Sequence, residues 1–194
     1  MALILASTST SRQAMLRHAG VAFTAMPSGV DEAALKSGFS GPPEALAAAL
    51  ARAKASAISA RHPQALVIGA DQLLVCDGKI YDKPRDLAQA AAHLRALSGR
   101  PHELVTAICL VQGGAPVWAH EENAHLTMRG FSERFLQDYL AAEGEEILHC
   151  VGAYRLEGLG AQLFTCIEGD YFTILGLPLL ALLGALRARG VVAA

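Results

Sequence analysis

Two oppositely charged residues on either side of a predicted turn are the first candidates for chemistry. Asp71 follows the apolar run Ala65 to Ile68 and separates it from a second apolar strand. Lys83 lies beyond the turn signal Asp77-Gly78, and Pro84 biases it towards an extended backbone. Burying a neutral polar group without a partner costs roughly 2–7 kcal/mol, and a charge costs more, so Asp71 is expected to face a cation, a proton donor or a cleft. Such a pair suits a metal-bound anionic substrate; the alternative is a strand-end aspartate with a solvated lysine.

A hydroxyl-rich segment, Ser7 to Ser11, is the second candidate. It follows the apolar strand Leu3 to Ala6 and leads into Arg12 and a helical pattern that Gly20 closes. Helix N–H groups, hydroxyls and a guanidinium together commonly hold phosphate. One serine is enough for a helix cap, so the alternative is an N-cap with spare hydroxyls. Five hydroxyl residues ahead of an arginine favour phosphate.

Three further charged residues stand in patterns that suit a site. Glu32 adjoins another carboxylate, and adjacent side chains on an extended segment point to opposite sides, so at most one can face a cleft. Lys54 belongs to an alanine-rich helix expected over Glu44 to Ala60, whose small side chains let it lean across a cleft. Glu157 precedes Gly158-Leu159-Gly160, and glycines permit close backbone approach to a ligand. The alternative for each is an ordinary surface charge.

The remaining periodicity predicts the elements that position these residues. Further strands are expected at Val21 to Met26, His102 to Val111, Val117 to Met128 and Leu163 to Ile167, with Gly113-Gly114 as a hairpin turn. Further helices are expected from Asp86 to Leu97, from Phe131 to Ala142, and at the end of the chain, with Pro178 in the first turn. Alternating strands and helices place the chain in the α/β class with a mixed sheet.

Composition excludes several classes of protein. The 194 residues are 53% apolar and 18% charged, which excludes disorder and allows one sizeable core or two small lobes. The net charge of −2 comes without basic blocks, so nucleic acid and anionic membranes are not expected partners. The longest apolar run, Leu177 to Leu186, contains a proline and is far shorter than the roughly 20 residues of a membrane span. With no basic leader at the N-terminus, we expect a soluble, cytoplasmic protein.

Several reaction classes lack their motifs. The four cysteines are too widely spaced for a C-x-x-C motif and are expected to be reduced and buried. The sequence has no H-x-x-x-H zinc pattern, no G-x-S-x-G nucleophile elbow and no complete P-loop. Zinc and acyl-transfer chemistry are therefore disfavoured.

Eight segments, taken in order, resemble one known family. They are LILASTSTSRQAML, VDE at Val30 to Glu32, ARAKA at Ala51 to Ala55, VIGADQ, DGKIYDKP, ALSGRPHEL, GAYRLEGLG and IEGDYFTILGLPL. Together they resemble the Maf family of septum-formation-associated nucleoside triphosphate pyrophosphatases over essentially the whole chain. The resemblance implies a single Maf-like domain over residues 1–194, with a mixed, twisted sheet, flanking helices and two lobes around a nucleotide cleft.

The resemblance also implies an activity and roles for residues. It implies a cytoplasmic, commonly homodimeric enzyme that cuts a nucleoside triphosphate between its α- and β-phosphates with a divalent cation, Mg²⁺ or alternatively Mn²⁺. Asp71 matches the catalytic acidic residue and is expected to hold the metal with Glu32; sequence leaves open which carboxylate is the general base. The other matched positions are the cleft-lining Lys54 and Lys83 and the phosphate-loop residues Ser7, Ser9 and Arg12.

Three positions bear on the choice of nucleotide. Gln72 and Glu157 resemble the subgroup that acts on 7-methyl-GTP, whereas the dTTP/UTP subgroup has threonine and glutamine there. A carboxylate can accept both donors of the guanine edge, and it favours the positive charge that N7 methylation adds. Ser11 departs from the tryptophan that is usual in the 7-methyl-GTP subgroup. The alternatives are a dTTP/UTP enzyme, a nucleotidyltransferase and a nucleotide-binding regulator of cell division without turnover.

Overall fold

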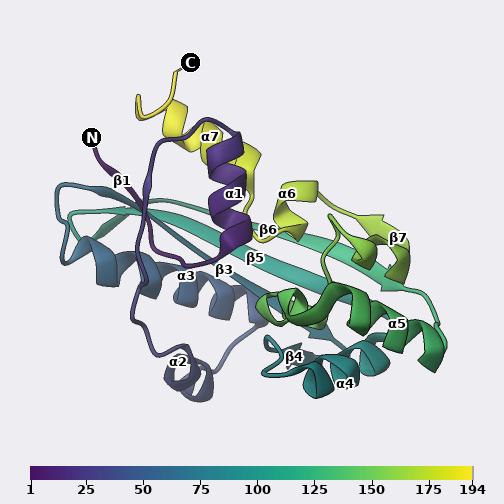
Figure 1. Cartoon of the computed structure of the whole chain (residues 1–194). Coiled ribbons are helices and arrows are strands. Elements are labelled where there is room, and N and C mark those ends of the chain that lie inside the picture. Colours follow the sequence, from purple (N-terminus) through teal and green to yellow (C-terminus); the bar gives the residue numbers. More distant parts are fainter. Residues whose placement is uncertain (194) are drawn as a thin grey trace. The chain divides into compact units, whose positions relative to one another are not determined.

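A mixed seven-stranded sheet with helices beside it forms the framework of the chain (Figure 1). The computed structural model describes residues 1–193. The strands are β1 (Leu3–Leu5), β2 (Thr24–Ala25), β3 (Leu66–Cys76), β4 (Lys79–Tyr81), β5 (Pro101–Gln112), β6 (Ala115–Met128) and β7 (Phe164–Glu168). The strand order is β2-β1-β3-β5-β6-β7, and β4 also pairs with β3. β1 is parallel to β2 and β3, whereas β4 and β7 are antiparallel to β3 and β6.

Seven α-helices and three 3₁₀ segments complete the described chain. The α-helices are α1 (Thr10–His18), α2 (Glu32–Gly38), α3 (Pro43–Ser59), α4 (Leu87–Leu97), α5 (Glu133–Glu143), α6 (Tyr171–Ile174) and α7 (Leu179–Arg187). The 3₁₀ segments are η1 (Gly144–His149), η2 (Val151–Ala153) and η3 (Leu159–Leu163). Within residues 1–193, every helix is too short or too polar to cross a membrane.

Contacts divide the chain into two compact units, which are described separately. Unit 1 comprises Met1–Gln72, Thr106–Glu122 and Tyr171–Ala194, and unit 2 comprises Leu73–Val105 and Asn123–Asp170. Strands β3, β5 and β6 each contribute residues to both units.

In unit 1, alternate side chains of β3 serve opposite faces of the sheet. Leu66, Ile68 and Ala70 join an apolar core with residues of α1 and α7. Figure 1 shows α1 and α7 on that side of the strands and α3 on the other. The intervening residues of β3 therefore face α3, as the two-residue period of a strand requires.

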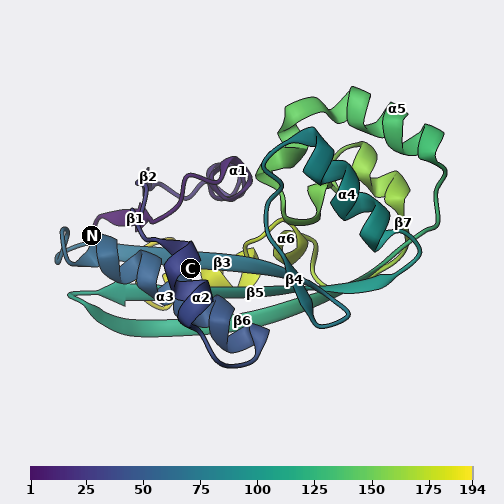
Figure 2. The ribbon, with the colours of Figure 1, turned by 90° about the horizontal axis from the view of Figure 1, so that it is seen from below.

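In unit 2, α4 and α5 lie side by side (Figure 2). Asp86 and Ser132 cap these helices, accepting the backbone N–H groups of Gln89 and Phe135 at 2.7 and 3.2 Å. Unit 2 also contains a ring cluster, in which His102 Nε2 lies 3.0 Å from the Tyr154 hydroxyl, and Phe164 meets the Tyr154 ring edge-on at 4.9 Å between centroids.

The predicted fold class is confirmed, with two local corrections. The alanine-rich helix, the Asp86-capped helix and the Gly113-Gly114 hairpin all form close to the expected bounds. The strand expected over Val21 to Met26 is reduced to β2, a two-residue strand. The break expected at Asp71 is absent, because β3 runs continuously through it. A strand interior tolerates this aspartate because a buried lysine meets it from α3.

Candidate active site

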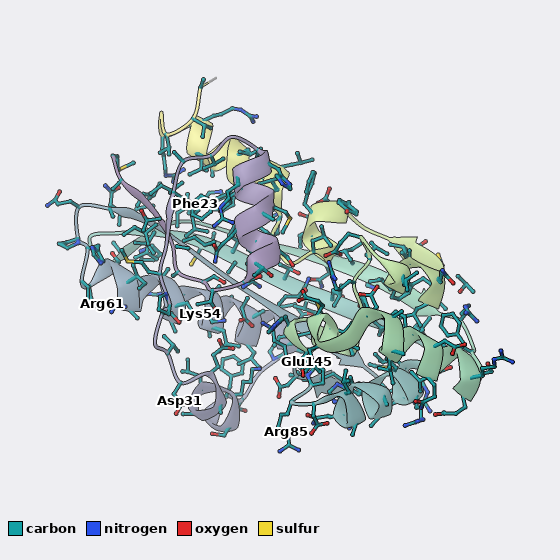
Figure 3. The ribbon with its side chains drawn as sticks, in the orientation of Figure 1. Phe23, Asp31, Lys54, Arg61, Arg85 and Glu145 are labelled. Carbon is teal, nitrogen blue, oxygen red and sulfur yellow. The ribbon has the colours of Figure 1, made fainter. Side chains whose placement is uncertain are left out.

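A single ammonium group joins two carboxylates in unit 1. Lys54 Nζ lies 2.5 Å from Asp71 Oδ1 and 2.8 Å from Glu32 Oε1. The side chains of Lys54 and Asp71 are 9% and 7% exposed, whereas that of Glu32 is 43% exposed. Lys54 is therefore a buried residue rather than a surface lysine (Figure 3). Two carboxylates on one ammonium leave the cluster with a net negative charge that is open to solvent on the Glu32 side.

Close packing of α3 on β3 brings Lys54 to Asp71. A Cβ placed on Gly69 would lie 2.1 Å from the Ala51 carbonyl oxygen and 2.8 Å from the Ala55 Cβ. Only glycine permits this approach. Asp71 lies two residues further along β3, on the same face of the strand, where Lys54 reaches it from α3.

The paired carboxylates at the start of α2 divide their tasks as expected. Asp31 is exposed and caps α2, its Oδ1 accepting the Ala34 N–H at 3.0 Å (Figure 3). Glu32, the first residue of the helix, contacts Lys54 instead. One acidic residue thus builds the helix end, and its neighbour faces the charged cluster.

The hydroxyl-rich segment forms the N-terminus of α1. Ser9 is the N-cap, its Oγ accepting the Arg12 N–H at 3.4 Å, and Ser7 Oγ accepts the Ser9 N–H at 3.1 Å. Both hydroxyls act as acceptors in these bonds, so each keeps its O–H to donate to an anion. Strands β1 and β3 are parallel, and Leu5 lies opposite Ile68. The hydroxyl-rich segment and Asp71 therefore both follow this pair in the same direction along the sheet.

Arg12 anchors the backbone beside this cluster. Its Nε donates to the Gly176 carbonyl at 2.7 Å, and its Nη1 donates to the Ala70 carbonyl at 3.0 Å. Burial lowers the pKa of Arg12, while the charges of Asp71 and Glu32 raise it. The guanidinium therefore lies within electrostatic reach of both carboxylates. Two of its five N–H donors are committed to carbonyls that fix the backbone.

Gln72 points to the opposite face of β3 from Asp71. Its Nε2 donates to Thr106 Oγ1 at 2.9 Å and to the Thr173 carbonyl at 2.8 Å. Its amide nitrogen therefore holds α6 against the sheet. Ser11, the other predicted specificity residue of this unit, is half-buried in the first turn of α1.

The other two predicted site residues belong to unit 2. Lys83 is exposed and follows β4, and Glu157 lies at the tip of the turn between η2 and η3. Both act on the same thiol: burial, the largest cause, and the charge of Glu157 raise the pKa of Cys150 to about 11, and the charge of Lys83 opposes this rise. Six predicted residues of unit 1 thus gather around β3 and the start of α1, namely Ser7, Ser9, Arg12, Glu32, Lys54 and Asp71.

A family match and two similar curated proteins agree on the family of this chain. The family described as Maf-like protein matches residues 2–189. The chain belongs to this family. It is 53% identical over 190 residues to "Nucleoside triphosphate pyrophosphatase" of Paramagnetospirillum magneticum, covering 96% of this chain and 98% of the relative. It is 50% identical over 193 residues to "7-methyl-GTP pyrophosphatase" of Rhizobium etli, covering 98% and 97%. A dITP/XTP pyrophosphatase structure from Mycobacterium abscessus aligns over 66% of this chain and 73% of its own, with 19% identity and a TM-score of 0.36, too low to add to this assignment.

The acidic pair of this Maf-like chain has the donor chemistry for a hard divalent cation. Asp71 and Glu32 offer carboxylate oxygens, which Mg²⁺ and Mn²⁺ prefer. Within residues 1–193 no group of three or more histidine, cysteine, aspartate or glutamate side chains is placed to hold a metal ion. Mg²⁺ commonly binds through one or two carboxylates and completes its shell with water and substrate phosphates, so the pair fits such an ion.

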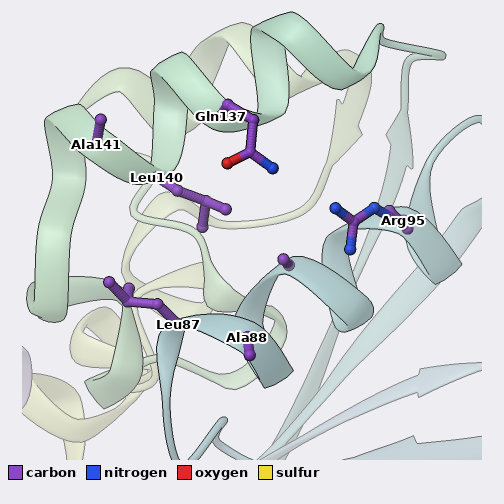
Figure 4. Close-up of a pocket in the computed structure, with 7 residues that line it drawn as sticks. Leu87, Ala88, Arg95, Gln137, Leu140 and Ala141 are labelled. Carbon is purple, nitrogen blue, oxygen red and sulfur yellow. The ribbon is translucent and has the colours of Figure 1, made fainter.

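None of the predicted residues lines a cavity of about 490 Å³ in unit 2 (Figure 4). Alanine and leucine side chains of α4 and α5 line it, with Arg95 and Gln137. Both polar residues are hydrogen-bonded to the Glu133 carboxylate, which accepts from Arg95 Nε at 3.0 Å and from Gln137 Nε2 at 2.7 Å. This mostly apolar lining does not suit a triphosphate.

Sequence reasoning missed residues that position the predicted site residues. Gly69 has a signal in the VIGADQ segment, since a glycine inside a strand suggests a close backbone approach. Thr106 and Thr173, which bind Gln72, carry no local signal, because the sheet brings them to Gln72 from distant parts of the chain.

Proposed function

We propose that this Maf-like chain is a nucleoside triphosphate pyrophosphatase that hydrolyses the bond between the α- and β-phosphates, releasing a nucleoside monophosphate and pyrophosphate. The observation that carries the proposal is the buried Lys54 ammonium that holds Asp71 and Glu32 beside the hydroxyl-rich start of α1. Acidic groups for a cation and donors for phosphate oxygens are what hydrolysis of a polyphosphate needs. The names of relatives that are 50 to 53% identical over nearly their full length support this reaction.

Each residue has a proposed task. Asp71, fixed by Lys54, orients the attacking water and accepts its proton. Ser7 and Ser9 donate their hydroxyls to phosphate oxygens, and Arg12 adds positive charge while fixing the backbone ahead of Asp71. Asp71 and Glu32 would hold a divalent cation, which when bound neutralises the triphosphate and its pyrophosphate leaving group. Lys83 of unit 2 is proposed to add charge neutralisation.

A turnover assay tests the reaction. Purified protein with Mg²⁺ and a triphosphate, without any acceptor, should release pyrophosphate, which separates hydrolysis from nucleotidyl transfer. Asp71→Asn should reduce kcat by about 10²-fold or more, because it removes the proton acceptor, while nucleotide binding persists. Asp138→Asn, on an exposed residue of α5, is the matched control. An Asp71→Asn variant with wild-type turnover would exclude Asp71 as the base.

The preferred substrate is proposed to be 7-methyl-GTP. Glu157 offers a carboxylate to a base that carries a positive charge, and Gln72 and Ser11 are the other proposed specificity residues. Assays of 7-methyl-GTP, GTP, dTTP and UTP at equal concentration test this preference. A pyrimidine preference would overturn the base assignment and leave the reaction in place.

A cytoplasmic location and a homodimer complete the proposal. Both come from the family resemblance. Fractionation of cells and light scattering of the purified protein test them directly.

A further inference from the structure

A buried carboxylate at the end of α5 stabilises the turn that carries Glu157. Glu143 is the last residue of α5, and its side chain is only 6% exposed. Its Oε1 accepts the Leu159 N–H at 2.8 Å, and a Cβ on Gly158 would lie 2.8 Å from the same oxygen. The glycine therefore allows the carboxylate to reach the backbone of the turn two residues after Glu157.

The location of Glu143 is electrostatically unfavourable for a helix. The C-terminal end of a helix carries partial negative charge, so an acidic residue there is disfavoured, and burial adds a desolvation cost. Arg155 offsets both costs, with Nη1 3.6 Å from Glu143 Oε2. The same guanidinium also lies near the predicted specificity residue, with Nε 3.7 Å from Glu157 Oε1.

Arg155 is thus shared between two carboxylates in unit 2. The trio carries a net charge of −1 when all three groups are ionised. If Glu143 were neutral, Arg155 would be left to Glu157 alone, and the pair would carry no net charge. Gly160 lets the backbone of this turn pass close to Arg155, since a Cβ there would lie 2.3 Å from the Arg155 carbonyl oxygen.

We propose that Glu143 is a positioning residue for base selection: it takes up the charge of Arg155 and fixes the turn, so that Glu157 keeps a net negative charge for a cationic base. This inference rests on the proposed role of Glu157 in recognising the nucleotide. It adds a residue, Glu143, that does not itself contact the base.

Product binding tests the inference without requiring turnover. Calorimetry gives the affinities of 7-methyl-GMP, whose base is cationic, and of GMP, and their ratio reports charge selection. Glu143→Gln keeps an oxygen for the Leu159 N–H but removes the charge, so the ratio should fall on the order of fivefold, the upper range for an exposed charge pair. Affinity for GMP should stay within about twofold.

A double variant separates charge balance from simple support of the fold. In Glu143→Gln combined with Arg155→Gln, Glu157 no longer has a competing cation, so the affinity ratio should return to the wild-type value. A merely structural Glu143 would show no such rescue. Glu145→Gln, on an exposed neighbour in η1 (Figure 3), is the control and should leave the ratio unchanged.

The outcomes distinguish this inference from the proposed reaction. Equal affinities for the two monophosphates in the wild type, an unchanged ratio in Glu143→Gln, or no rescue in the double variant would each overturn the role of Glu143. A wild-type protein that selects 7-methyl-GMP but releases no pyrophosphate from any triphosphate would overturn the reaction and leave the role of Glu143 standing.

Discussion

At the scale of single residues, the Lys54 and Asp71 pair links stability to the site. Both side chains are almost fully buried, so removing one partner leaves an uncompensated charge. Lys54→Met should lower the free energy of unfolding by about 3 kcal/mol, measured by urea denaturation. Adding Asp71→Leu should recover most of that loss, because the unpaired carboxylate is gone. Glu32→Gln, at a half-exposed position, should cost less than about 1 kcal/mol. An equal loss in Lys54→Met and in the double variant would contradict this account.

A second residue, His102, predicts how stability depends on pH. Burial lowers the pKa of His102 to about 4 in the folded protein, against about 6.5 in the unfolded chain. Between these two pH values the unfolded state binds a proton that the folded state does not. The contribution of His102 to the free energy of unfolding is therefore full above pH 6.5 and is lost as the pH falls towards 4. The predicted loss is about 3 kcal/mol over this window. Urea denaturation at several pH values should show it.

The control for this pH dependence is an exposed histidine. His102→Gln should remove this part of the slope, whereas His125→Gln, at a side chain 63% exposed, should retain it. The same slope in the wild type and in His102→Gln would assign the pH dependence to other groups.

At the scale of elements, the contact between α3 and β3 decides whether Lys54 meets Asp71. Gly69→Ala would place a methyl group 2.1 Å from the Ala51 carbonyl oxygen, so α3 must move away from the strand. We expect a loss of about 3 kcal/mol in unfolding free energy and a loss of turnover, because overpacking strains the contact. Gly184→Ala is the matched control: it lies inside α7 with no atom within 4 Å of the new Cβ and should stabilise by about 0.5–1 kcal/mol. A neutral Gly69→Ala would show that the two elements separate without cost.

The elements also show how far sequence alone could reach. Long periodic helices such as α3 and α4, and the β5 and β6 hairpin, follow from local patterns and were predicted near their observed bounds. Asp71 was expected to interrupt a strand, because a buried aspartate needs a partner. That prediction was wrong because the partner, Lys54, comes from another element, and local sequence does not reveal it. Lys54 and Glu32 were identified as candidates by type and resemblance, but their shared contact depends on how α2 and α3 pack. Glu143 carried no signal at all, because its role arises from a turn that follows it at a distance in the chain.

At the scale of the whole molecule, removing the metal by chelation should abolish activity without destabilising the fold. Within residues 1–193 no cluster of three or more metal-ligating side chains is found, and the Lys54 ammonium already contacts both Asp71 and Glu32, which leaves one net negative charge. Chelation with EDTA should therefore leave Tm unchanged in the absence of nucleotide and abolish pyrophosphate release. With Mg²⁺ and a non-hydrolysable triphosphate at 100 times its Kd, linkage predicts about 2.7 kcal/mol of stabilisation, a rise in Tm of roughly 5–10 °C that EDTA reverses. In Asp71→Asn combined with Glu32→Gln, the part of that rise that depends on the metal should disappear. A fall in Tm on chelation of the nucleotide-free protein would instead show that the metal stabilises the fold itself, contrary to a cation that binds together with its substrate.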